Sequence, residues 1–238
     1  MSSGRHRVPD VADEAEPGPR PNPVPRSDAG LVVDAVSYAR NGRTILEQVS
    51  VVAAPGTSLA VVGPSGSGKS SLLALMAGLE RPDSGAVRRS QHGSTPAVTG
   101  LILQGYGLVS VLTAAENVEV PLQAGASGAL SRSEVRSRAA AALDSVGLTD
   151  VADHLIEELS GGQQQRVAIA RALVLQPTVL FADELTAELD HDWKDHVVDL
   201  VLGIALRGGT VVLATHDLEI AARCDYVVRL VDGQVSAA

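Results

Sequence analysis

The segment from residue 58 to residue 79 most constrains what this chain can fold into. Residues 58–62 are mainly apolar and predict a buried strand, and the run from Lys69 to about Leu79 predicts a helix that ends before Pro82. The residues between and at the start of the helix read G-x-x-x-x-G-K-S: Gly63, Pro64, Ser65, Gly66, Ser67, Gly68, Lys69 and Ser70. A glycine-rich loop between a strand and a helix predicts a phosphate-binding loop, because its backbone N–H groups and the helix N-terminus both attract an anion.

Two side chains of this loop have expected roles toward a nucleotide. Lys69 is expected to reach the β- and γ-phosphates, Ser70 to ligate Mg²⁺, and Ser71 to lie beside them. Lys69 is one of only two lysines among 19 basic residues, the other being Lys194. A plain turn with Lys69 as a surface charge is the alternative, but it does not explain the full match. The loop alone does not distinguish a kinase, a GTPase and an ATPase.

Composition excludes several other classes of protein. With 238 residues and 45% hydrophobic content, the chain can form one large domain or two small ones. Its longest apolar runs, such as 170–175, are far shorter than the roughly 20 residues that cross a bilayer, and the N-terminus shows no secretory leader, so we expect a cytoplasmic protein. The net charge of −9 argues against nucleic acid as the main partner. Cys224 is the single cysteine and forms neither an internal disulfide nor a metal-ligand pair.

The chain divides into a tail and one folded domain. Residues 1–29 hold six of the twelve prolines and predict a disordered tail, and residues 30–238 predict the domain. The domain opens with β segments at 31–33, 44–46 and 49–53, which predict an antiparallel layer.

The rest of the domain alternates helices with strands. Residues of about 105–165 predict a helical subdomain, which includes a helix with a Ser131/Glu134 capping box that Gly147 ends. Strands at 178–182 and 210–214 alternate with helices and predict a parallel sheet, and residues 226–235 predict a final hairpin.

A second glycine motif identifies the family. Residues 159–166 read L-S-G-G-Q-Q-Q-R and precede an apolar helical run. Ser160 is a good N-cap, and Gly161 and Gly162 leave backbone N–H groups free to face an anion. An ordinary capped helix is the alternative, but it explains only the serine and one glycine. With the phosphate-binding loop in the same chain, this octapeptide resembles the signature of the ABC ATPases.

The resemblance implies a functional dimer that binds ATP. In that family the signature of one subunit, here Ser160, Gly161, Gly162 and Gln163, closes over the γ-phosphate that is bound to the loop of a second subunit. Two ATP molecules are then held in a head-to-tail homodimer or heterodimer. Asp190, in the A-E-L-D segment at 187–190, occupies the D-loop position that couples the two sites, although it is also a plausible helix N-terminal acid.

The hydrolytic residues follow predicted strands. Asp183 and Glu184 end an apolar strand and resemble a Walker B pair, in which Asp183 holds Mg²⁺ and Glu184 is the general base for the attacking water. Gln104 matches the Q-loop glutamine, which contacts Mg²⁺, the attacking water and the membrane partner. His216 matches the switch histidine that contacts the γ-phosphate. The alternative for each of these two is a structural or solvated side chain.

Four sites depart from the family pattern. The adenine-stacking aromatic residue aligns with Arg40, whose planar cation can also stack on a purine, and Tyr38 is the alternative. Leu185 replaces the proline that usually follows the catalytic glutamate, and Ala187 replaces a glycine or a small hydroxyl residue. The Q-loop continues with Gly105-Tyr106-Gly107 instead of the usual aromatic pair.

The resemblance covers residues 31–238 and implies the fold and the function together. The fold is α/β, with a P-loop NTPase core that has a mainly parallel sheet, an N-terminal antiparallel β subdomain and an inserted α-helical subdomain. The function is hydrolysis of ATP, with Mg²⁺, to power transport through separate integral-membrane permease subunits at the cytoplasmic face of the membrane. Residues 113–122 are most similar to the lipoprotein-release, macrolide-export and cell-division subgroup. A non-transport regulator of an envelope or cell-division complex is the alternative function.

Overall fold

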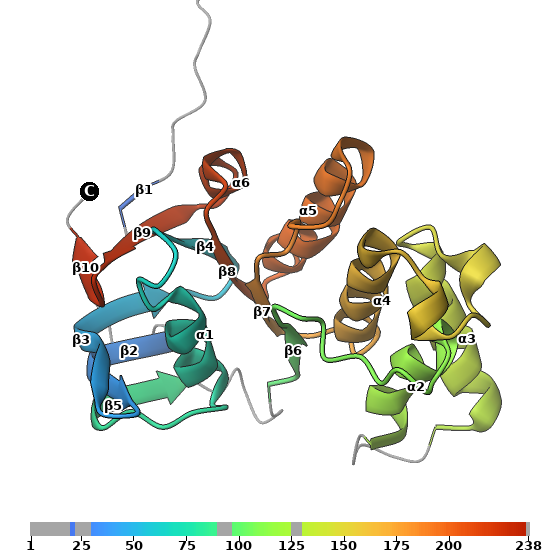
Figure 1. Cartoon of the computed structure of the whole chain (residues 1–238), viewed down its shortest axis with the longest axis horizontal. Helices are drawn as coiled ribbons and strands as arrows, with labels where there is room; N and C mark the ends of the chain where they lie inside the picture. Colours follow the sequence, from blue (N-terminus) through green and yellow to red (C-terminus); the bar gives the residue numbers. More distant parts are fainter. Residues whose placement is uncertain (1–19, 22–29, 90–96, 125–129, 237–238) are drawn as a thin grey trace, which may run out of the picture.

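A central parallel sheet organises the chain (Figure 1). The structure is a computed structural model and describes residues 20–21, 30–89, 97–124 and 130–236, so most of the predicted disordered tail lies outside the described residues. The strands of this sheet are, in spatial order, β1 (Arg20–Pro21), β9 (Tyr226–Val231), β4 (Thr57–Val62), β8 (Thr210–Thr215), β7 (Val179–Asp183) and β6 (Thr99–Ile102), with β10 (Gln234–Ser236) antiparallel to β9. All pairs from β1 to β6 along this order are parallel. The predicted parallel sheet and final hairpin are therefore confirmed.

The N-terminal part of the described chain forms a smaller antiparallel sheet. It consists of β2 (Leu31–Arg40), β3 (Arg43–Ala53) and β5 (Ser84–Arg89), in the order β3-β2-β5. The sequence predicted two segments where β3 is continuous, because a bulge at Gln48 (φ 51°) joins them. β5 was not predicted, since it is short and mostly polar.

Side chains of the parallel strands alternate between two hydrophobic cores. On β4, Leu59 and Val61 face the core shared with the antiparallel sheet and α1 (Lys69–Ala77), whereas Ala60 and Val62 face the larger core. On β7, Phe181 belongs to the first core and Leu180 to the second. Strands buried on both faces explain the near-continuous apolar runs in the sequence.

The helices cover the sheet and form a helical lobe. They are α2 (Ala114–Ala124), α3 (Arg132–Asp144), α4 (Gly161–Leu173), α5 (His191–Leu206) and α6 (Leu218–Ala222), with short 3₁₀ turns at η1 (Thr149–Val151) and η2 (Ile156–Glu158). The α2, α3 and α4 helices pack on one another, while α5 and α6 pack against β4 and β8. The predicted capping box of α3 is present, but α3 ends at Asp144, three residues before Gly147. Among the residues with described positions, no helix is both long and apolar enough to cross a membrane.

The parallel arrangement brings four sequence motifs to one edge of the sheet. The phosphate-binding loop follows β4, Asp183 ends β7, His216 follows β8 and Gln104 lies two residues after β6. Ligands of open α/β sheets bind at the carboxyl ends of the strands, so this edge is the candidate site.

Candidate active site

The phosphate-binding loop curls tightly around its own lysine. The Lys69 side chain is buried, and its Nζ donates hydrogen bonds to the carbonyl oxygens of Gly63 (2.9 Å) and Pro64 (3.1 Å). Gly68 has a φ of 103°, and a Cβ on it would lie 2.7 Å from Leu46 on β3. Glycine is needed there both for its conformation and for its lack of a side chain.

Ser67 gives an independent sign that the loop is shaped for a ligand. Among the buried side-chain polar atoms in the described part of the chain, its Oγ is the one that has no hydrogen-bond partner. A Cβ on Gly63 would lie 2.9 Å from this Oγ and 2.1 Å from the carbonyl oxygen of Leu230. Buried polar groups are almost always paired, so an unpaired hydroxyl in a cradle of glycines fits a loop that binds an anion.

Ser70 and Asp183 supply adjacent oxygen atoms for a cation. The two side chains are hydrogen bonded, and Asp183 is only 7% exposed. Burial raises the pKa of Asp183 above its usual range and the charge of Glu184 raises it further, while the Ser70 hydrogen bond and the Lys69 charge oppose this. Hard oxygen donors are the ligands that Mg²⁺ prefers, so this pair fits the cation.

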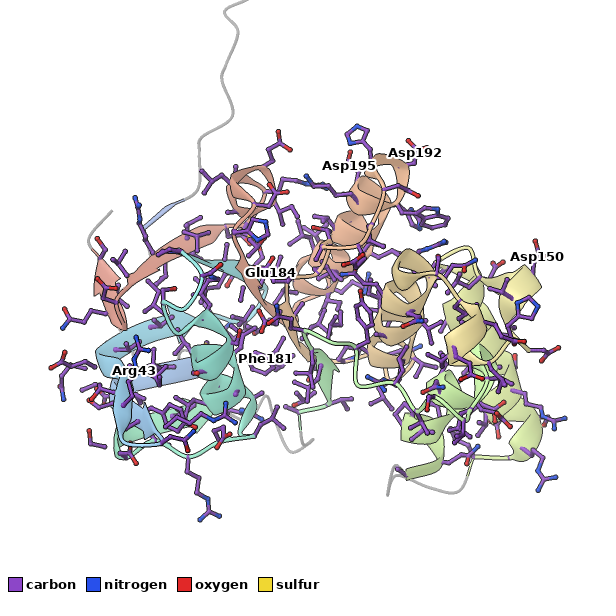
Figure 2. The ribbon with its side chains drawn as sticks, viewed as in Figure 1. Arg43, Asp150, Phe181, Glu184, Asp192 and Asp195 are labelled. Atoms are coloured by element: carbon purple, nitrogen blue, oxygen red, sulfur yellow. The ribbon has the colours of Figure 1, made fainter. Side chains whose placement is uncertain are left out.

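Glu184 and His216 contact each other directly. Glu184 Oε2 lies 2.9 Å from Nδ1 of His216, and the glutamate is 17% exposed whereas the histidine is 73% exposed. Glu184 has a φ of 53°, which costs a non-glycine residue about 1 to 3 kcal/mol. Its backbone N–H is fixed by the carbonyl of Ala214 on β8 (2.9 Å). Figure 2 shows Glu184 near the middle of the molecule, above Phe181 of β7, the strand that Glu184 follows.

The signature residues lie apart from the loop and pack on the D-loop of the same chain. Ser160 and Gln163 form a capping box at the start of α4, and α4 lies on the far side of β6 from α1 (Figure 1). Gly162 is close to Glu188, since a Cβ on it would lie 2.7 Å from that carbonyl oxygen. Asp190 caps α5 by accepting a hydrogen bond from Trp193 N–H (3.0 Å).

These elements surround a cavity of about 260 Å³, which we call the signature cavity. The residues that line it are Ser160, Gly162, Gln163, Arg166, Glu188, Leu189, Asp190 and Trp193. The Arg166 guanidinium stacks on the Trp193 ring at 4.2 Å, and burial lowers the pKa of Arg166. No residue of the phosphate-binding loop lines this cavity, so the loop and the signature residues lie at separate places on the chain.

The remaining predicted residues lie around the edge of the site. Gln104 is exposed. Arg40 is also exposed and lies 4.0 Å from Glu80, whereas Tyr38 is 8% exposed and belongs to the core beneath α1. The burial of Tyr38 leaves Arg40 as the better placed of the two for stacking on a purine.

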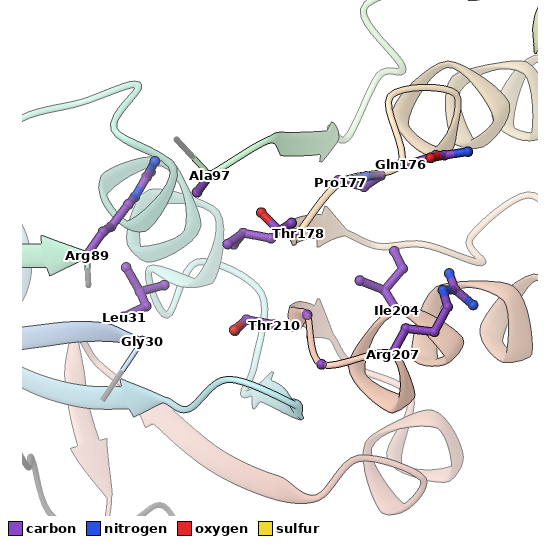
Figure 3. Close-up of a pocket in the computed structure, with 13 residues that line it drawn as sticks. Gly30, Leu31, Arg89, Ala97, Gln176, Pro177, Thr178, Ile204, Arg207 and Thr210 are labelled. Carbon is purple, nitrogen blue, oxygen red and sulfur yellow. The ribbon is translucent and has the colours of Figure 1, made fainter. Parts of the chain in front are cut away.

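A separate cavity of about 300 Å³ lies at the opposite edge of the sheet (Figure 3). Its lining includes Thr178 and Thr210, at the amino ends of β7 and β8, together with Arg207. None of the predicted site residues lines it.

Comparison with known proteins decides the family. The profile of the family described as ABC transporter matches residues 46–187, which is more than half of the chain. The chain belongs to the ABC transporter family.

Two curated ABC proteins and one solved cassette are similar over most of their lengths. An uncharacterised ABC transporter ATP-binding protein of Escherichia coli K12, YbbA, is 41% identical over 220 residues, which are 84% of this chain and 92% of the relative. The lipoprotein-releasing system ATP-binding protein LolD 1 of Rhodopirellula baltica is 41% identical over 219 residues, 85% and 94% of the two chains. The dimeric post-hydrolysis structure of the ATP-binding cassette MJ0796, bound to ADP and Pi, is 33% identical with a TM-score of 0.80, covering 87% of this chain and 97% of that chain. The predicted fold class and family are confirmed, and the chain is an ABC-type ATP hydrolase.

Three side chains that hold loops of this ABC ATPase carry little recognisable signal in the sequence. Gln165 on α4 bonds to the segment that carries Glu184. Arg171, also on α4, donates to the Q-loop carbonyls of Gly107 (2.5 Å) and Tyr106 (2.6 Å). The one signal in the sequence is that Gln165 and Arg171 are polar residues in a helix whose other residues from 167 to 173 are apolar.

Asn117 is the third such side chain, and it holds the segment after the Q-loop. It is buried, accepts from Val109 N–H (2.8 Å) and donates to the carbonyls of Val109 (3.1 Å) and Thr113 (2.9 Å). A buried amide with its partners satisfied in this way fixes the local backbone.

Proposed function

We propose that this chain is the Mg²⁺-dependent motor subunit of an ABC transporter and works as a homodimer or heterodimer of ATPase subunits. The observation that carries the proposal is the separation of the two phosphate-binding motifs. Lys69 and Ser70 lie with Asp183 at the sheet edge, whereas Ser160 precedes α4 and lines the signature cavity, which no residue of the loop lines. A head-to-tail pair of chains would bring the loop of one subunit to the signature of the other, with one ATP at each of two interfaces.

The residues in and around the loop have different proposed roles toward ATP. Lys69, which now bonds two loop carbonyls, would exchange them for β- and γ-phosphate oxygens, a stronger charge-assisted contact. Ser70 and Asp183 would hold Mg²⁺, with Gln104 as a further ligand, and bound Mg²⁺ would neutralise charge on the phosphate oxygens. Ser71 and the backbone of the loop would complete the cradle, and Arg40 would stack on the adenine.

Glu184 is the proposed general base, and His216 controls it. Nδ1 of His216 contacts one of the two carboxylate oxygens of Glu184, Oε2, at 2.9 Å. Contact of His216 with a γ-phosphate would release the carboxylate for catalysis. Because His216 is far more exposed than Glu184, the histidine is the member of the pair that can move.

The Q-loop face is the proposed contact with the membrane permease. Three apolar side chains are exposed there, Leu103 (42%), Val109 (44%) and Val111 (80%), although the backbone around them is fixed by Arg171 and Asn117. A rigid backbone that exposes apolar side chains suits a protein partner. We therefore place the chain at the cytoplasmic face of the membrane. The similarity to LolD 1 supports a permease of the lipoprotein-release, macrolide-export and cell-division subgroup.

The proposed domain limits follow from the same assignment. The ATPase domain covers residues 30–238, and its helical subdomain covers about 105–165. The predicted tail, residues 1–29, lies outside the described residues except for Arg20–Pro21, which form β1 and pair with β9.

Glu184→Gln tests the proposed mechanism. This variant keeps the shape of the side chain but cannot accept a proton, so hydrolysis should fall by about 10²- to 10⁴-fold. With Mg²⁺-ATP it should elute as a dimer in size-exclusion chromatography, because binding persists without turnover. Glu157→Gln, at an exposed glutamate outside every motif of the site, is the control for the same substitution and should hydrolyse ATP near the wild-type rate. Wild-type turnover in Glu184→Gln would remove Glu184 from its role.

A further inference from the structure

The Gln165 side chain is buried at the centre of the catalytic segment. It is 1% exposed on α4, and its Nε2 donates hydrogen bonds to the carbonyl oxygens of Glu184 (3.0 Å) and Leu185 (2.6 Å). Its Oε1 accepts a hydrogen bond from the backbone N–H of Glu188 (2.9 Å). One side chain therefore binds both ends of the five-residue segment 184–188, which runs from the proposed general base to the D-loop.

The chemistry of these partners determines the orientation of the amide. Carbonyl oxygens can only accept and a backbone N–H can only donate, so the nitrogen of Gln165 must face Glu184 and Leu185. Both amide hydrogens are then used. Neither a carboxylate nor an apolar side chain at position 165 can make the same set of contacts.

The segment that Gln165 holds needs such a support. Glu184 has a left-handed backbone conformation (φ 53°), which a non-glycine residue keeps only when surrounding contacts impose it. Leu185 has no ring to restrict its φ, unlike the proline that usually stands there in the family. Within the segment, the turn bond from Ala187 N–H to the Glu184 carbonyl is long, at 3.4 Å.

We propose that Gln165 is a positioning residue for hydrolysis, which holds the backbone of Glu184 so that its carboxylate reaches the attacking water. The inference rests on the proposed role of Glu184 as the general base. It also gives the signature helix a direct connection to the catalytic segment of its own chain, because Gln165 lies five residues after Ser160 on α4.

The test compares Gln165→Met with Gln123→Met in the full-length protein. Gln123 is the control for the substitution itself, because it also lies on a helix, α2, and its Nε2 donates a hydrogen bond to Glu119 (3.1 Å), outside the motifs of the site. Gln165→Met should lower kcat by about 10- to 100-fold, since small misplacements of a catalytic group have effects of this size. KM for ATP should change less than about twofold in both variants, and Gln123→Met should keep kcat within about threefold.

Combination with Glu184→Gln separates positioning from a general loss of structure. If Gln165 acts through Glu184, adding Gln165→Met to Glu184→Gln should change the residual rate less than about twofold. An equal loss in both backgrounds, or a kcat for Gln165→Met within about twofold of wild type, would overturn the inference. A fully active Glu184→Gln would instead defeat the proposed function itself, so the two failures are distinguishable.

Hydrogen exchange keeps the inference falsifiable where Gln165→Met does not fold. In the wild-type protein the Glu188 amide should exchange at least about 100-fold more slowly than an unprotected amide, because Gln165 accepts its hydrogen bond. Exchange at the unprotected rate would contradict the contact on which the positioning role depends.

Discussion

Two adjacent glycines of the signature should respond in opposite ways to a single methyl group. Alanine at Gly162 would place Cβ 2.7 Å from the Glu188 carbonyl oxygen, whereas at Gly161 it would lie 3.3 Å from the Glu188 carboxylate oxygen. The carboxylate is the end of a flexible side chain and can move away. The carbonyl belongs to the segment that Gln165 holds, so the backbone of α4 or of this segment must move by about 0.7 Å to restore an ordinary contact of 3.4 Å.

The difference in melting temperature between the two variants can be calculated because the gain in helix propensity is the same in both. Both glycines lie in the first turn of α4, so each gains about 0.4 to 1 kcal/mol from alanine. Gly162→Ala also carries an overpacking cost of about 1 to 3 kcal/mol. It should therefore melt about 2 to 10 °C below Gly161→Ala, which should be as stable as wild type or more so.

Thermal unfolding of the nucleotide-free protein is the appropriate assay. Both glycines are candidate ATP contacts, so their effects on turnover would mix binding with packing. A melting temperature for Gly162→Ala equal to or above that of Gly161→Ala would refute the close packing of the signature on the D-loop.

Two further predictions concern α5. Lys194→Met should lower the melting temperature modestly at pH 7, because Lys194 lies 2.6 Å from Asp217 and lowers the pKa of that carboxyl below its usual value. A depressed carboxyl pKa stabilises the fold at pH values above the unfolded-state pKa, and this stabilisation is lost as the pH falls through the folded-state pKa. The melting temperatures of wild type and variant should therefore converge as the pH falls below the folded-state pKa of Asp217, and a constant difference would contradict this. Trp193 is the only tryptophan in the sequence and lines the signature cavity. Its fluorescence emission should therefore change when Mg²⁺-ATP drives the hydrolysis-deficient Glu184→Gln variant to dimerise. The emission should not change when Mg²⁺-ATP is added to Lys69→Ala. A dimer with unchanged emission would mean that the cavity does not take part in the interface.

Local patterns were sufficient where function depends on consecutive residues. The strand, loop and helix around Lys69, the capped signature helix and the acidic end of β7 were all predicted from spacing, because glycines, caps and apolar runs act over a few residues. Boundaries were less accurate. The sequence separated the halves of β3, and it ended α3 at Gly147 where the helix ends at Asp144, because bulges and terminal turns depend on neighbouring strands and helices.

Contacts between distant segments could not be predicted in this way. Nothing in the sequence shows that Gln165 bonds to residues about twenty positions later, or that Tyr38 is buried while Arg40 is exposed. The glutamine looks like any polar residue of a helix until packing places it against the catalytic segment. The direct contact between Glu184 and His216 likewise requires β7 and β8 to be adjacent.

The sequence by itself therefore determined the family, the nucleotide loop and the types of residue available for hydrolysis, because these depend on short motifs with fixed spacing. The tertiary structure alone decided how those residues are held. It placed Glu184 against His216, packed Gly162 against Glu188 and kept the phosphate-binding loop out of the lining of the signature cavity. The physical reason is that a buried hydrogen bond or a close backbone approach depends on which elements pack together. Short motifs do not show which distant residues will meet.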